Sequence, residues 1–171
     1  MIKYIILTIL IGSNGFALDL PKQASETLAK WNPEFQAYDI ADYSKTIIDL
    51  FTQNKQPMIF SADLNSDKLN DFVILGKDKK KSYVVALMAG KKKWIPVEVS
   101  AWTEEDALKS EVLNPKTNLK EMSITVYISV AEDGLAETIK PRKAIQVERY
   151  LAQPELFEIK NNAAVKLTLK N

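Results

Sequence analysis

The chain has 171 residues, with 23 Lys and Arg against 22 Asp and Glu, and it contains neither His nor Cys. This composition excludes Ser-His-Asp and Cys-His catalysis, disulfide bonds, and zinc sites built from imidazole or thiolate. The balanced charge provides no overall attraction to nucleic acid or to an anionic membrane. Any catalysis would have to rest on carboxylate, Lys, Tyr or Ser side chains.

The first seventeen residues have the order of a secretory signal peptide. Lys3 supplies a positive charge, residues 4–11 are apolar apart from Thr8, and small or polar residues follow up to Ala17. The apolar run is too short to span a bilayer, because a spanning helix needs about 20 residues. We therefore expect cleavage after Ala17, a periplasmic or secreted location of the bacterial type, and no stable membrane anchor afterwards. The alternative is a buried N-terminal strand.

Residues 18–171 have a length typical of a single domain. Two helices are expected near its start. Pro21 suits a first helical turn, so the first helix is predicted over residues 21–30, before Asn32 and Pro33. Asp42 is a good N-cap, so the second is predicted from there to about Gln53. Apolar residues at helical spacing mark the buried faces of the two helices: Ala24, Leu28 and Trp31, then Tyr43, Ile47, Leu50 and Phe51.

The rest of the chain is dominated by short strand patterns separated by turns. Asn161 and Asn162 form a two-residue hairpin turn that tolerates positive φ. Residues 103–120 are ambiguous, with a helix start at Thr103 and a loop at 114–118. Strands are predicted at 58–62, 72–75, 82–88, 94–99, 122–130, 144–151, 156–160 and 163–169. These patterns predict an α+β fold in which N-terminal helices pack on an antiparallel β-sheet meander.

One loop has the spacing of a metal site. Asp63, Asn65, Asp67 and Asp71 occupy positions 1, 3, 5 and 9 of the loop, and the carbonyl of Leu69 is at position 7. Calcium takes six to eight oxygen ligands, which such a spacing can wrap around a cation. These five residues are therefore the candidate metal ligands. Position 12 is apolar, so the bidentate Glu of an EF-hand is missing.

The pattern D-x-N-x-D-x-x-x-D between two strands resembles the calcium loop of FG-GAP or VCBS-type repeats. The chain also resembles small exported bacterial proteins of unknown function that carry one such loop. The family loops have Gly at positions 4 and 6, whereas this chain has Ser66 and Lys68. Lys68 also brings a positive charge to the expected cation. The alternative is a hairpin loop in which Asp and Asn side chains cap backbone N–H groups as Asx-turns.

Three other groups of residues have both a functional and a structural interpretation. Lysines at 77, 79–81 and 91–93 can bind anionic polymers, or they can be solvated turns that protect sheet edges. Glu104, Glu105 and Asp106 can be catalytic acids, but a helix start explains them better. Trp31, Trp94 and Trp102 can stack on carbohydrate, or they can pack in the core and its rim.

The function expected from the sequence is that of an exported, non-catalytic binding or interaction protein with a Ca²⁺ loop at 63–71. Its partner is expected to be an envelope or extracellular protein or a glycan, and not nucleic acid. One alternative is a carboxylate-based hydrolase of envelope polysaccharide, which would need two opposed carboxylates in a cleft. Another is an inhibitor or immunity-type partner of a second exported protein, which a protruding rigid loop would favour.

Overall fold

The computed structural model describes residues 20–50, 56–103, 109–131, 143–149 and 151–168. Within these described residues, strands make up 52% and there are two short α-helices, so the fold is mainly β. The prediction of an α+β fold with N-terminal helices packed on a β-sheet is therefore wrong. Two local differences account for much of this result. The second helix begins at Lys45 rather than at Asp42, and the ambiguous stretch before residue 120 contains a strand. The predicted end of that helix near Gln53 lies outside the described residues.

The helical segments are α1 (Lys22–Trp31), the 3-10 turn η1 (Ile40–Asp42) and α2 (Lys45–Leu50). Helix α1 begins after Pro21 and ends at Trp31, with Asn32 as its C-cap, close to the predicted bounds. The predicted second helix starts later, because Asp39 and Asp42 form a reciprocal capping box on η1 instead. The side chain of Ser44 then accepts a hydrogen bond from the backbone N–H of Ile47 in α2. Neither α-helix, at 10 and 6 residues, has the length and hydropathy needed to cross a bilayer.

The first sheet contains β1 (Gln36–Ala37), β2 (Ile59–Ala62), β3 (Asp71–Lys77), β4 (Lys81–Ala89) and β5 (Trp94–Thr103). The order is β1-β3-β4-β5, and β2 also pairs with β3, all antiparallel. A Cβ on Gly76 would lie 2.5 Å from the backbone oxygen of Gln36, so only glycine allows β1 to approach β3 this closely.

The second sheet contains β8 (Val126–Ala131), β9 (Ala144–Arg149), β10 (Glu155–Lys160) and β11 (Ala163–Leu167), in the order β11-β10-β9-β8. The predicted hairpin turn at Asn161 and Asn162 is confirmed, with φ of 51° and 59°. A separate two-stranded sheet pairs β6 (Lys109–Leu113) with β7 (Lys120–Ile124). The strand predicted over 122–130 is thus divided between β7 and β8.

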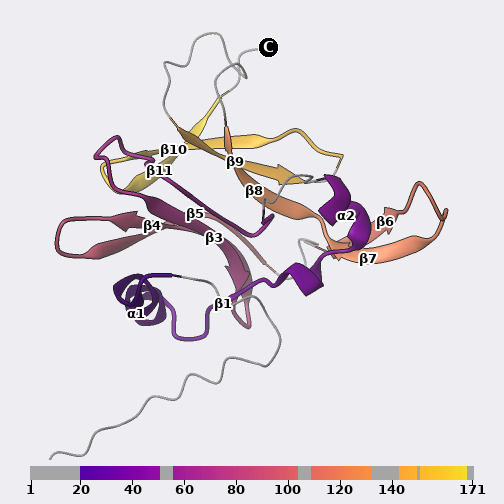
Figure 1. Ribbon diagram of the computed structural model, residues 1–171, viewed down its shortest axis with the longest axis horizontal. Helices are drawn as coiled ribbons and strands as arrows, with labels where there is room; N and C mark the ends of the chain where they lie inside the picture. The colour runs from indigo at the N-terminus through magenta and orange to yellow at the C-terminus, as the bar shows by residue number, and fades with distance from the viewer. Residues whose placement is uncertain (1–19, 51–55, 104–108, 132–142, 150, 169–171) are drawn as a thin grey trace, which may run out of the picture.

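The two larger sheets pack face to face, and α1 lies on the opposite face of the first sheet (Figure 1). Alternate residues of β4 serve the two layers: Val84 and Ala86 join the core between the sheets, while Val85 and Leu87 face α1. Burial of both faces explains why β4 is an almost continuous apolar run. The β6–β7 hairpin extends from the body beside α2 (Figure 1).

Candidate functional site

The loop that joins β2 to β3 is organised by side chains that accept hydrogen bonds from the loop's own backbone. The Asp63 carboxylate accepts N–H groups of Asp67 and Lys68 at 3.1 and 3.0 Å. Asn65 Oδ1 accepts the N–H of Asp67 at 3.1 Å, and Asp67 Oδ1 accepts that of Leu69 at 2.8 Å. The Asn65 and Asp67 contacts, each to the N–H two residues on, are the Asx-turns that the sequence offered as the alternative to a metal site.

Two loop residues have left-handed backbone conformations. Ser66 has a φ of 64° and Lys68 a φ of 70°. They occupy positions 4 and 6, where the resembling calcium loops have glycine. The chain therefore adopts this turn without glycine, and the left-handed backbone costs about 1 kcal/mol at each of these two positions.

Asp71 closes the loop from inside the protein. It is fully buried, and its two carboxylate oxygens accept the N–H of Leu64 at 2.9 Å and that of Ala89 at 2.7 Å. Burial raises the pKa of Asp71, these two hydrogen bonds oppose the rise, and the negative charges of Asp67 and Asp63 add to it. Asp71 therefore connects the loop to the end of β4.

The carboxylates of this loop are already occupied by N–H donors. The second oxygen of Asp67, Oδ2, accepts the Asn65 side-chain amide at 3.1 Å. Within the described residues, no three acidic side chains form a group that could hold a metal ion. Calcium binding by Asp63, Asn65, Asp67, Leu69 and Asp71 stays a prediction. The cation would bind at the lone pairs that these N–H donors leave on the exposed oxygens of Asn65 and Asp67.

The β6–β7 hairpin is a feature that the sequence analysis missed. Its inner face is fixed to the segment around α2 by two hydrogen bonds, from Ser44 and Thr46, and a third, from Asn114, lies within the hairpin itself. The Ser44 N–H donates to Ser123 Oγ at 2.9 Å, while Glu121 accepts from Asn114 Nδ2 at 2.9 Å and Thr46 Oγ1 at 3.3 Å. On the same face, fully buried Val112 of β6 contributes to the main core.

The opposite side of the hairpin is exposed and carries Leu113 and Met122 beside Lys109, Glu111 and Lys120. Leu113 is 50% exposed and Met122 is 64% exposed. Leu119, which is also 64% exposed, lies where the turn meets β7, and its carbonyl accepts the N–H of Asn114. These three apolar residues, which we call the hairpin patch, are half of the six exposed large hydrophobic residues in the described part of the chain. Glu111 and Lys120 form an exposed ion pair of 2.7 Å on the same side. The hairpin is therefore held on one face and free on the other.

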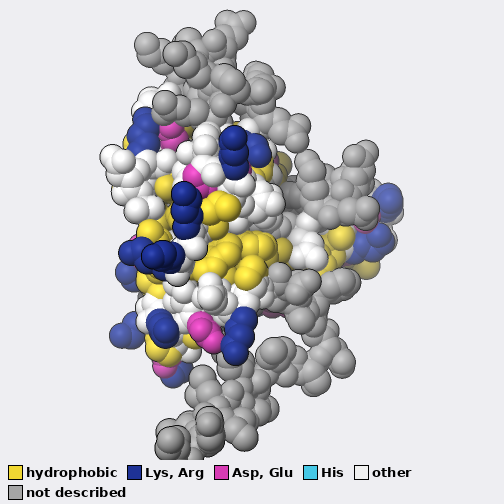
Figure 2. Space-filling view, turned by 60° about the vertical axis from the view of Figure 1, so that its left-hand side comes forward, with side chains coloured by type: hydrophobic (Ala, Val, Ile, Leu, Met, Phe, Trp, Pro, Cys, Tyr) yellow, Lys and Arg dark blue, Asp and Glu magenta, His cyan; other side chains and the backbone are white. Residues whose placement is uncertain are grey.

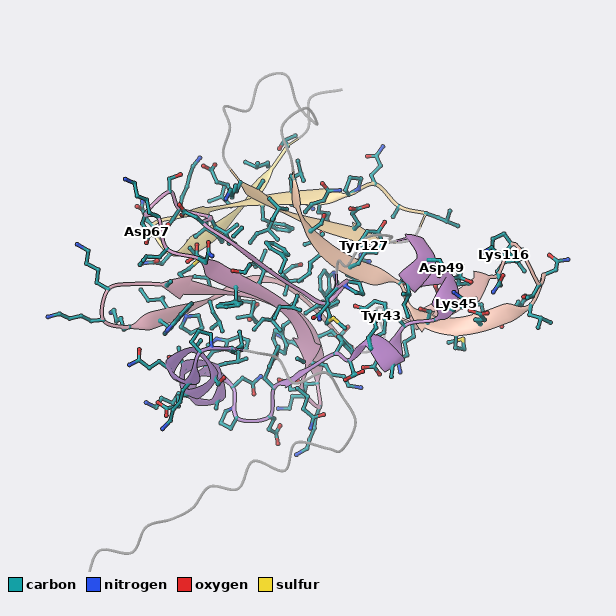
Figure 3. All side chains as sticks on the ribbon, viewed as in Figure 1. Tyr43, Lys45, Asp49, Asp67, Lys116 and Tyr127 are labelled. Atoms are coloured by element: carbon teal, nitrogen blue, oxygen red, sulfur yellow. The ribbon has the colours of Figure 1, made fainter. Side chains whose placement is uncertain are left out.

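Lys116 in the hairpin turn lies on the α2 side of the molecule, near the Lys45–Asp49 pair (Figure 3). A 2.8 Å hydrogen bond from Lys45 lowers the pKa of Asp49, and the positive charge of Lys116 also lowers it. The turn that carries Lys116 is closed by Asn114, whose carbonyl accepts the N–H of Asn118 at 2.8 Å. This confirms the loop predicted at 114–118.

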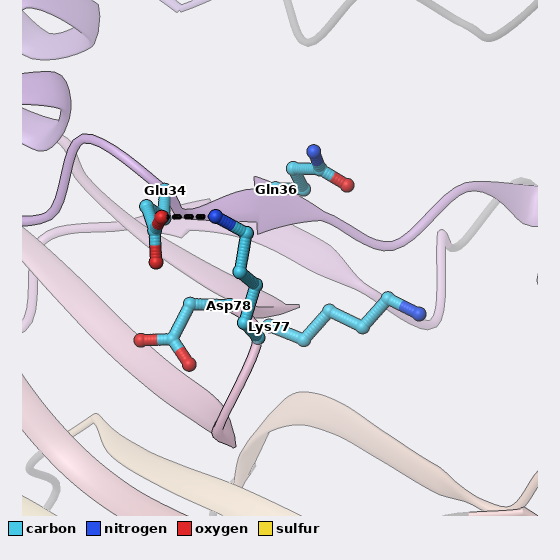
Figure 4. A pocket seen from close by; sticks show the side chains of 5 residues that line it. Glu34, Gln36, Lys77 and Asp78 are labelled. Carbon is cyan, nitrogen blue, oxygen red and sulfur yellow. Dashed lines mark hydrogen bonds and ion pairs between the residues drawn. The ribbon is translucent and has the colours of Figure 1, made fainter.

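A polar pocket of about 340 Å³ contains two carboxylates (Figure 4). Its lining residues are Glu34, Gln36, Lys77, Asp78 and Lys79. Lys79 pairs with Glu34, and the Asp78 carboxylate accepts the N–H groups of Lys80 and Lys81, the Asn32 amide and the Tyr83 hydroxyl. The hydrogen bond from the Lys80 N–H is the main reason that the pKa of Asp78 lies well below its usual range.

This pocket does not have the properties of an acid–base pair. A general acid needs a raised pKa, whereas Asp78 stays ionised and caps the β3–β4 turn. Burial and the Asp78 contact raise the pKa of Tyr83 to about 12, so its hydroxyl remains the donor. Glu34 is committed to an exposed ion pair. The pocket therefore gives no support to a carboxylate-based hydrolase.

The other candidate groups do not form a common site. Trp31 packs edge-to-face on Tyr83, whereas Trp94 and Trp102 lie at opposite ends of β5. Lysines 79–81 and 91–93 lie at opposite ends of β4. On the face shown in Figure 2, Lys and Arg side chains lie at separate places around a central apolar area. Residues 104–106 lie outside the described part of the chain.

Comparison with known proteins returned no matching family model, no matching curated protein and no matching solved structure. The fold and the surface define the chain as a mainly-β protein that presents an anchored hairpin. Any functional proposal for this chain rests on its own residues.

Proposed function

We propose that the protein is a non-catalytic binding protein that acts outside the cytoplasm, and that the β6–β7 hairpin is its binding element. The hairpin patch is the observation that carries this proposal. Leu113 and Met122 are exposed on one face of the hairpin and Leu119 is exposed where its turn meets β7, while the other face is fixed by Glu121 and Ser123. Apolar side chains that gather on a fixed projecting element are typical of interaction surfaces.

The location outside the cytoplasm rests on the leader at residues 1–17, which lies outside the described residues. Its short apolar run and small-residue end at Ala17 favour cleavage. A Ca²⁺ ion at loop 63–71 would be a second element of this function. Two features support it: the oxygen-rich spacing and the negative charges of Asp63 and Asp67, which already act on Asp71. Calcium would there stiffen the β2–β3 connection.

An inhibitor or immunity-type role is the second candidate, because the hairpin is the kind of protruding, supported element that such proteins use. It differs from the first only in the partner, which would be a protein whose action is blocked. The polysaccharide hydrolase is not favoured, since Asp78 and Glu34 in the polar pocket are engaged in structural contacts.

Site-specific photo-crosslinking tests the proposed function. A photoreactive residue is placed at Met122 in the hairpin patch, and at Val165 on β11 as a control that is 40% exposed. The proposal predicts a discrete adduct from position 122 in producing cells and none from position 165. Equal labelling from both positions, or none from 122, would contradict it.

A further inference from the structure

We draw no further inference here: the strongest candidate, the exposed face of the β6–β7 hairpin with Leu113 and Met122, is already the binding element of the proposed function, and nothing in the structure shows what covers it.

Discussion

Asp71 and Ala89 are joined by a 2.7 Å hydrogen bond in which the backbone N–H of Ala89 donates to a buried carboxylate oxygen. The other oxygen of Asp71 accepts the N–H of Leu64. One side chain thus links the 63–70 loop, the start of β3 and the end of β4. The same residue was singled out in the sequence only as a metal ligand.

Asp71→Asn should lower the free energy of unfolding by about 1 to 3 kcal/mol, because an amide NH₂ would leave one buried N–H without an acceptor. Urea unfolding followed by tryptophan fluorescence measures the change. Asp63→Asn, on the half-buried side of the loop, is the matched control and should cost less. Equal stability of Asp71→Asn and the unchanged chain would show that this link contributes nothing.

Glu121→Ala should destabilise the hairpin by about 1 kcal/mol, because Asn114 and Thr46 lose their acceptor. Glu111→Ala removes a carboxylate from the same hairpin but only breaks the exposed pair with Lys120, so it should cost less than about 0.5 kcal/mol. Denaturant midpoints of the two variants provide the comparison. A larger loss for Glu111→Ala would mean that the hairpin is not held through its inner face.

Asp78 should make the stability of the folded protein depend on pH. Its pKa is lowered in the folded protein, first by the Lys80 N–H, so ionised Asp78 contributes stability above its unfolded pKa of about 3.9. That contribution is lost as pH falls below this value toward the folded pKa. Asp78→Asn should therefore lose less stability between pH 6 and pH 2.5 (about the window set by these pKa values) than the unchanged chain. Parallel acid dependence of the two proteins would contradict this assignment.

Calcium should raise the thermal unfolding midpoint of the chelator-treated protein, because a ligand that binds only the folded state stabilises it. Asp67→Ala should abolish the shift, while Asp49→Ala, an exposed acid in α2 outside the loop, should retain it. Calorimetric scans with and without millimolar Ca²⁺ provide the measurement. An unchanged midpoint in the unaltered protein would remove the metal site and leave the Asx-turns as the whole role of the loop.

The sequence predicted local structure better than it predicted the fold. Helix α1 and the Asn161–Asn162 turn have strong local signals, and the structure places both close to the expected residues. Strand β6 was missed because Lys109, Ser110 and Glu111 favour strands weakly, and only the pairing with β7 makes them one. That omission, together with the later start of α2, contributed to the wrong fold class.

The two candidate sites also differed in how well the sequence predicted them. The Asp63–Asp71 loop was found from its spacing, because its side chains act on nearby backbone. The hairpin patch depends on which face of β6 and β7 the core covers, and this is set by contacts with residues more than seventy positions away, such as Ser44 with Ser123. The sequence signal was the alternation of Met122 and Ile124 with Glu121 and Ser123, whereas Val112 and Leu113 are adjacent and show no alternation.

Oxidation of Met122 by dilute peroxide tests the central claim, that the exposed face of the hairpin is covered by a partner in the protein's own environment. Met122 is 64% exposed, whereas Met58 and Met88 are 4% and 2% exposed and serve as internal references. In the purified protein, Met122 should oxidise much faster than the two references. In intact producing cells it should be protected several-fold, and an equal rate for Met122 in both settings would contradict the account.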